Sequence, residues 1–300
     1  MNNRHLISYF TLAGVAAVFL VAFPLAAQEP PGDGPAGGFP GGGGRGGGRG
    51  FGRGRANLPP PGPTPRTADG HPDMSGYWNA ANNGGAVFEV QKHETRSRSL
   101  PRGNGAIVDP PDGLIPYQPW AAAKAKDNFE HHLADEPELH CYESGLPNQM
   151  YRQFGFQILE PAGYIVMNWE FMHAYRIIPT DNRPHTLPAS AKLFMGDSVG
   201  HWEGDTFVVD TTNFNDRTWL DSAGNIHSDQ MHVIERFTMV NDRTINYEAT
   251  IEDPKTYTRP WKVAFSFNRN RQRDYETMEF ACDSGNTDLQ HYVKDAGGTK

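Results

Sequence analysis

Histidine, arginine and carboxylate side chains gather in the stretch "HAYRIIPTDNRPH", which holds His173, Arg176, Asp181, Arg183 and His185. A histidine exchanges protons near neutral pH, and an arginine can bind a carboxylate or an oxyanion. The stretch therefore suits acid–base chemistry on a polar substrate. The alternative is structural: Asp181 and its neighbours could simply form a turn, and His173 could be a hydrogen-bonded core histidine.

A second group lies in "DSAGNIHSDQMHVIER", which holds Asp221, His227, His232, Glu235 and Arg236. The two histidines stand five residues apart, which is not the four-residue spacing of a helical zinc-protease pair. A mixed histidine–carboxylate metal site is one alternative, and we predict no metal ligands. Glu235 and its neighbour Arg236 could also be charges paired across a sheet.

The stretch "SVGHWEGDTFVVDTTNF" adds a third group. Glu203 and Asp205 flank a glycine, so "WEGD" reads as a hairpin bend that Trp202 covers. Asp210 differs, because aspartate is disfavoured within a β-branched strand. We expect Asp210 to face a polar cavity or a cation. Ser198 lacks the strand–elbow–helix context of a nucleophilic serine.

The elements that must position these side chains read mostly as short strands separated by tight turns. The only good helix pattern is "PWAAAKAKDNFEHHLA", residues 119–134, in which Pro119 suits the first turn and the Ala-Lys repeats favour helix. Many short strands with little helix indicate an all-β fold, a single antiparallel sandwich or lipocalin-like barrel with one short helix. A barrel of this size can hold one small ligand.

Period-two alternation assigns the faces of these strands. It places Glu235 with Val233 and Phe237 on one apolar face, and His173 with Tyr175 on another. A polar group on an apolar face must be paired, because burial without a partner is costly. Such a group either lines a site or forms a buried pair.

The amino-terminal part of the chain predicts export. Residues 1–27 combine a short basic start, an apolar run and small residues before Gln28, as in a secretory signal peptide. An uncleaved membrane anchor is the alternative, but Pro24 and the small residues favour cleavage. Residues 28–68 are rich in Gly, Arg and Pro and predict a disordered linker. A β-rich domain over 69–300 remains, which we expect in the periplasm or outside the cell without stable membrane insertion.

Charge and cysteine content narrow the class of protein. Residues 1–68 hold six of the chain's 27 basic residues and two of its 35 acidic residues, which leaves the domain with 21 basic and 33 acidic residues. This acidic balance argues against nucleic acid as a partner. Cys141 and Cys282 favour one disulfide in an oxidising compartment, with two buried thiols as the alternative.

Five segments appear together in one order: "IIPTDNRPH", "GDSVGHWEGDTFVVDTTNFN", "HVIERF", "IEDPKTYTRPW" and "EFACD". Over about residues 70–285 the chain resembles a recurrent, functionally uncharacterised family of exported bacterial proteins that carry a G-x-S-x-G-x-W-E-G-D-T strand motif. The resemblance implies one β-rich exported domain and no particular activity. Where the family usually has glycine in "TDGR", this chain has Asn182, which tolerates left-handed backbone geometry.

These observations predict an exported acid–base enzyme, a lyase or hydrolase, acting on a carbohydrate or another small polar molecule. The alternatives are a non-catalytic ligand-binding or envelope scaffold protein of the same fold, and metal-assisted hydrolysis. We expect a small-molecule or glycan partner and no cofactor, because the chain has neither a P-loop nor a dinucleotide fingerprint; the oligomeric state stays open. The catalytic candidates are His173, His227, Glu235 and Asp210, and the substrate-binding candidates are Arg176, Arg183, His185, Tyr175 and Trp202.

Overall fold

The computed structural model describes residues 60–81, 89–94, 105–152, 154–272, 274–280 and 282. The chain divides into two units, Met1–Leu58 and Pro59–Lys300, and every described residue belongs to the second unit. The predicted signal peptide and the linker up to residue 59 therefore lie outside the described residues.

The described residues form ten strands, two α-helices and three 3-10 turns. The strands are β1 (Gly76–Ala81), β2 (Ile107–Asp109), β3 (Phe156–Leu159), β4 (Tyr164–Trp169), β5 (Tyr175–Pro179), β6 (Asp197–Glu203), β7 (Thr206–Thr212), β8 (His232–Asn241), β9 (Thr244–Glu252) and β10 (Trp261–Arg269). The helices are α1 (Pro119–His131) and the single-turn α2 (Asn148–Tyr151), and the 3-10 turns are η1 (Leu133–Asp135), η2 (Pro137–His140) and η3 (Phe171–His173).

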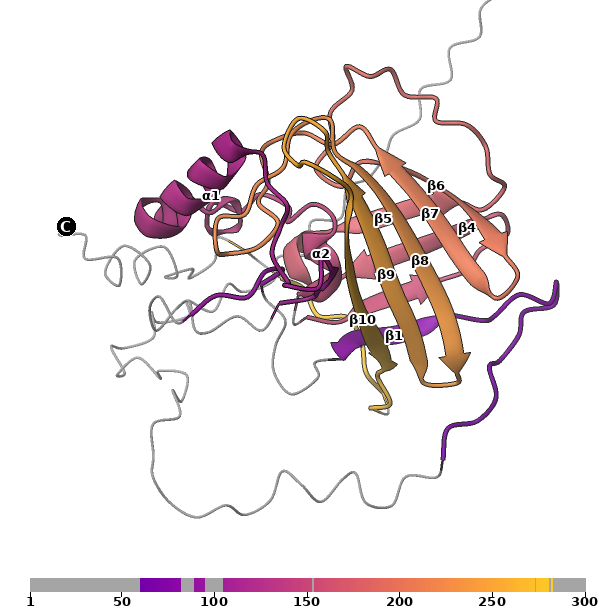
Figure 1. Cartoon of the computed structure of the whole chain (residues 1–300). Helices are drawn as coiled ribbons and strands as arrows, with labels where there is room; N and C mark the ends of the chain where they lie inside the picture. The colour runs from indigo at the N-terminus through magenta and orange to yellow at the C-terminus, as the bar shows by residue number, and fades with distance from the viewer. Residues whose placement is uncertain are drawn as a thin grey trace, which may run out of the picture. The chain divides into compact units, whose positions relative to one another are not determined.

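All of the strands join one antiparallel sheet in the order β5-β4-β3-β1-β10-β9-β8-β7-β6, with β2 paired to β10. The sheet curls into a nearly closed barrel, in which Figure 1 shows β8, β9 and β10 side by side. Its two edge strands meet where the Asn182 amide, just after β5, donates to the Gly200 carbonyl of β6 at 3.0 Å. The predicted antiparallel barrel is confirmed, and α2 adds one helical turn to the single helix that we expected.

Side chains fill the inside of the barrel. Aromatic rings from β7, β8, β9 and β10 pack there, among them the fully buried Phe207, Phe237 and Phe267. The predicted hairpin bend at "WEGD" joins β6 to β7, with Gly204 at φ 60°. Trp202 closes that end of the core, since its ring centroid lies 5.2 Å from that of Phe207.

The predicted face of β8 is confirmed, and that of β5 is wrong. Glu235 points inward with the buried Val233 and Phe237. On β5, however, Tyr175 and Ile177 point outward and are 62% and 56% exposed, and the side chain between them points inward. Alternation holds within β5, but the apolar side chains face outward and the arginine faces inward. His173 leaves this face because η3 interrupts the extended chain before β5.

Residues 60–68, which we assigned to the linker, contact the barrel. The Gly62 amide donates to Asp242 Oδ1 at 2.7 Å, the Thr64 hydroxyl donates to the Met239 carbonyl, and Arg66 forms an ion pair of 2.6 Å with Asp205. The part of the chain that contacts the folded domain therefore begins by residue 60.

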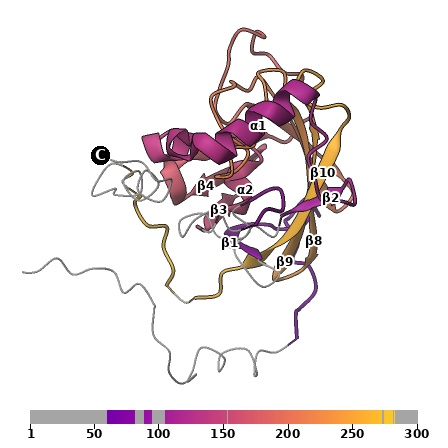
Figure 2. The same cartoon turned by 60° about the vertical axis from the view of Figure 1, so that its left-hand side comes forward.

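Helix α1 lies outside the ring of strands, next to the loop between β9 and β10 (Figure 2). It begins at Pro119, as predicted, and the Gln118 amide before it donates to the Thr256 carbonyl at 2.8 Å. The Trp120 indole also donates to the Lys255 carbonyl at 3.1 Å. Among the described residues, no helix has the length and the apolar character needed to cross a bilayer.

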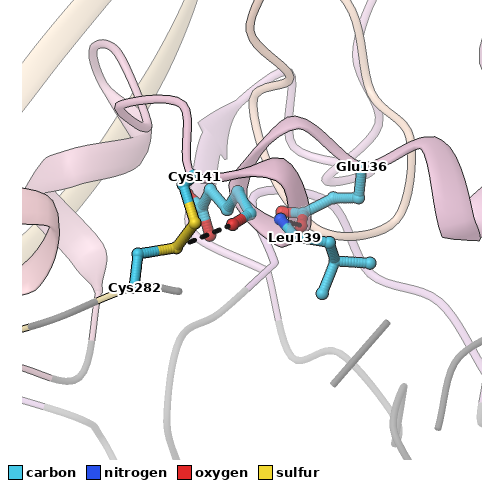
Figure 3. Close-up of a disulfide and its surroundings, with 5 residues drawn as sticks. Glu136, Leu139, Cys141 and Cys282 are labelled. Atoms are coloured by element: carbon cyan, nitrogen blue, oxygen red, sulfur yellow. Dashed lines mark hydrogen bonds between the residues drawn. A yellow bond between two sulfur atoms is a disulfide. The ribbon is translucent and has the colours of Figure 1, made fainter. Parts of the chain in front are cut away.

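The predicted disulfide between Cys141 and Cys282 is confirmed. Figure 3 shows the bond joining the end of η2 to the segment that follows β10, next to Leu139. It ties the carboxy-terminal segment to the face of the domain on which the short helical turns lie.

Candidate functional site

The two predicted catalytic histidines, His173 and His227, form hydrogen bonds within the protein and do not line a common site. In the buried His227, Nδ1 donates to the Ser228 carbonyl at 3.0 Å, so Nε2 accepts from the Thr218 hydroxyl at 2.7 Å. Burial lowers the pKa of His227, which favours the neutral ring. His173 lies exposed in η3, and its Nε2 accepts from the Phe280 amide at 3.2 Å. His227 is therefore a hydrogen-bonded core histidine, the alternative that we had raised for His173. His173 itself is exposed and does not lie on an apolar strand face.

Glu235 and Arg176 form a buried ion pair across the barrel. The guanidinium contacts both carboxylate oxygens, at 2.6 and 3.2 Å, and the Tyr247 hydroxyl donates to Oε1 at 2.9 Å. The same guanidinium donates to the hydroxyls of Ser198 on β6 and Thr211 on β7, at 3.0 and 3.2 Å. These bonds connect β5 to β6, β7, β8 and β9 near the seam of the barrel. The structure thus joins a predicted catalytic acid to a predicted binding residue, but in a structural pair.

Asp210 lies outside the barrel in a chain of alternating carboxylates and imidazoles. Its Oδ1 lies 3.0 Å from Nε2 of both His185 and His232. His185 Nδ1 lies 2.9 Å from Asp197 Oδ2, and His232 Nδ1 lies 3.5 Å from Glu252 Oε2. We call these five residues the Asp–His chain.

The hydrogen bond from His232 lowers the pKa of Asp210, and Asp210 in turn raises the pKa of His232. The polar surroundings that we expected for Asp210 are therefore imidazoles. Within the described residues, no group of three or more histidine, cysteine or acidic side chains is arranged to hold a metal ion.

Arg183 and Trp202, two more of the predicted binding residues, each contact other parts of the protein. Arg183 is exposed, forms two 2.8 Å bonds with Asp181 and lies over the Tyr164 ring, which fits the turn alternative. Asn182, between them, has the left-handed φ of 54° that the turn requires. Trp202 stacks on His71 at 4.7 Å.

One pocket brings several predicted residues together. It has a volume of about 400 Å³ and lies where β5 and β6 meet the loop that leads into β6. We call it the β5–β6 pocket. Tyr175 and Arg176 line it from β5, and Asp197, the first member of the Asp–His chain, lines it from β6. Two predicted binding residues therefore line this pocket, and His185 is one hydrogen bond away.

Glu143 and Asp197 give the β5–β6 pocket two carboxyl groups in different surroundings. Glu143 is half-buried, and desolvation raises its pKa. It has no hydrogen bond or ion pair with any other described residue. Asp197, in contrast, accepts from His185. An imidazole between two carboxylates can donate to both only when both of its nitrogens carry a proton.

The sequence analysis missed both of these carboxyl groups. Asp197 stands directly before Ser198 at the start of a strand, and Glu143 follows Cys141 by two residues, so the only signal for Glu143 was its nearness to a predicted disulfide. The pairing of Asp197 with His185 depends on how a long loop folds back, which alternation does not describe.

The fold and the site together define an all-β barrel protein with a carboxyl-lined surface pocket. No protein-family model matches the chain, and neither do the curated proteins or the solved structures with which it was compared. The resemblance to the exported bacterial family stays a prediction.

Proposed function

We propose that the protein is an exported acid–base enzyme, a lyase or hydrolase, which acts on a carbohydrate or another small polar molecule in the β5–β6 pocket. The observation that carries the proposal is the pair of carboxyl groups that line this pocket in unlike surroundings. A carboxyl group with a raised pKa is suited to give a proton, and a carboxylate held in place by an imidazole is suited to accept one.

Glu143 is the candidate acid. Its raised pKa keeps more of the carboxyl protonated as the pH approaches neutrality, and in this state it can protonate a leaving oxygen. Asp197 is the candidate base, with His185 behind it to hold its orientation. In hydrolysis, the bond from carbon to the leaving oxygen breaks as Glu143 gives its proton to that oxygen. Water adds to the carbon and gives a proton to Asp197.

The other walls of the pocket suit a polar ring. Tyr175 presents an exposed aromatic face, on which a sugar ring can stack. The Ser198 hydroxyl is fixed by Arg176 at 3.0 Å and can contact a substrate hydroxyl. The volume of about 400 Å³ lies in the range of small-molecule sites.

The test is turnover of a panel of glycosides and polysaccharides by the purified protein, with Glu143→Gln and Asp197→Asn as variants. We expect each variant to lower kcat by about 10²- to 10⁴-fold with little change in Tm. The matched control is Glu203→Gln, because Glu203 pairs with Arg236 at 2.8 Å outside the pocket. Turnover that is equal in Glu143→Gln and the wild type would rule out the assigned acid, and no turnover of any substrate would contradict the proposal.

One observation favours a second candidate function, a non-catalytic ligand-binding protein. The polar atoms of Glu235 and His227 are bonded within the protein, so these residues are not available to a substrate. Saturable binding of a glycan in calorimetry, without turnover and weakened by Tyr175→Ala, would support this function instead.

A further inference from the structure

A second cavity, of about 720 Å³, lies beneath α1 and away from the β5–β6 pocket. We call it the α1 cavity. One wall is α1 itself, a second is the segment of residues 110–117, and the rest comes from Gln91, His93, Ala223, Asn225 and Arg259. It shares no lining residue with the β5–β6 pocket.

Hydrogen bonds fix the walls of the α1 cavity to one another. The buried Asn128 of α1 donates to the Gly224 carbonyl at 3.1 Å. Tyr117 donates to Asn225 Oδ1 at 3.1 Å, and Gln91 accepts from the Ile115 amide at 2.7 Å. The cavity is thus part of the architecture of the domain and does not result from a loosely packed helix.

The face of α1 that lines the cavity is narrow and mostly apolar. Ala122, Ala125, Lys126 and Phe129 follow the three- and four-residue spacing of one helix face. The alanine side chains are short, so they leave space between α1 and the other walls of the cavity. This space can take a ring system, because Phe129 and apolar residues of segment 110–117 also line it.

Two cations at the cavity come from different walls. Lys126 extends from α1 and Arg259 from the loop before β10, and Asp112 is the one carboxylate among the lining residues. Both cations have acidic neighbours, Glu130 for the lysine and Asp109 for the arginine. The exposed Lys126–Glu130 pair, at 3.8 Å, contributes little, so the lysine can also contact a ligand. Arg259 binds both oxygens of Asp109 through Nη1 and Nη2 at 3.1 Å, which leaves its Nε–H for a ligand.

His93, which lines the cavity, and the neighbouring Glu89 do not place a carboxylate charge against a bound anion. His93 Nδ1 donates to the Glu94 carbonyl at 2.8 Å, and its Nε2 lies 3.9 Å from Glu89 Oε2. Burial, followed by the nearby Asp221, raises the pKa of Glu89 well above its usual range, which favours the neutral carboxyl. Lys126 and Arg259 stand against the single carboxylate of Asp112, so the Lys, Arg, Asp and Glu residues that line the cavity carry a net charge of +1.

We propose that the α1 cavity binds a small organic acid with an aromatic body. The ring system contacts the alanine face of α1, and the acid group contacts Lys126 and Arg259. This site is independent of the proposed acid–base chemistry, because it needs neither Glu143 nor Asp197.

The test uses 1-anilinonaphthalene-8-sulfonate, an aromatic sulfonate, in a fluorescence titration of the folded protein. We expect saturable binding at one site. Ala125→Trp fills the cavity and should raise the Kd at least tenfold, whereas Ala123→Trp, on the exposed side of the same helix, should leave it unchanged. Ala122→Trp is the second filling variant, because Ala122 lines the cavity from an exposed position and its replacement does not disturb the core.

The role of charge is tested with Lys126→Gln combined with Arg259→Gln. This change should raise the Kd of the sulfonate about three- to tenfold. The Kd of uncharged N-phenyl-1-naphthylamine should not change, and Lys124→Gln is the matched control. Unchanged sulfonate binding in both filling variants, or a Kd that Tyr175→Ala raises instead, would overturn the assignment, as would equal loss of both probes in the charge variant.

Discussion

The buried ion pair between Arg176 and Glu235 offers the sharpest test of the fold. In Glu235→Met the guanidinium loses both carboxylate contacts, at 2.6 and 3.2 Å, and Tyr247 loses its acceptor. Glu235 is fully buried, so water cannot replace these bonds. Leaving one charge of a buried pair without its partner costs about 3–5 kcal/mol. We therefore expect the free energy of unfolding to fall by that amount.

The measurement is urea unfolding followed by tryptophan fluorescence, with Arg176→Met and the double variant in the same series. Replacing both charges with apolar side chains removes the unpaired charge, so the double variant should be more stable than Glu235→Met. Tyr247→Phe should cost about 1.5–3 kcal/mol, the contribution of one hydrogen bond to a charged group. If Glu235→Met changes the unfolding free energy by less than about 1 kcal/mol, or if the double variant is the least stable of the series, the reasoning about this pair is wrong.

Three further predictions concern stability. Replacing Cys141 and Cys282 with serine should lower the unfolding free energy by roughly 2–5 kcal/mol, since the bond joins residues 141 positions apart; equal urea midpoints with and without dithiothreitol in the wild type would contradict this. The hydrogen bond to Asp210 raises the pKa of His232, so the stabilisation from this pair is complete below the ordinary histidine pKa of 6.5 and is lost as the pH rises through the folded-state pKa. Thermal melts from pH 5.5 to 9 should show this trend, and Asp210→Asn should weaken it, because Glu252 also raises the pKa of His232. Burial lowers the pKa of His227, so its contribution to stability depends on pH in the opposite direction. That contribution is complete above pH 6.5 and falls as the pH drops below this value, because the unfolded chain then binds a proton that the folded protein does not. The fall of the urea midpoint below pH 6.5 should be smaller in His227→Gln than in the wild type.

Period-two alternation predicted the β-rich fold and the inward side of Glu235. Both can be read from the order of apolar and polar residues within each strand. Glu235 could be placed inside the barrel from Val233 and Phe237 on either side of it. The same rule grouped Tyr175 correctly with Ile177 but not with His173, because η3 interrupts the extended chain before β5. The apolar side of β5 faces outward because the inward position belongs to Arg176. An arginine inside a barrel is tolerated only with its partner, which lies 59 residues further along the chain.

The candidate site was less accessible to sequence reasoning because its members come from separate segments. Asp210 was singled out correctly as unusual within a strand, but its contacts with His185 and His232 depend on sheet register and on a loop that folds back. The alanines of α1 could be read only as helix formers, since the room beside Ala125 exists only once the opposite wall is in place.

The positions of the two cysteines impose an order on oxidative maturation. Cys141 precedes β3 and Cys282 follows β10, so eight of the ten described strands lie between them. During synthesis from the amino terminus, Cys141 has no second thiol in the chain until the last of these strands has been made. An internal disulfide therefore cannot form on a chain that still lacks any of the ten described strands.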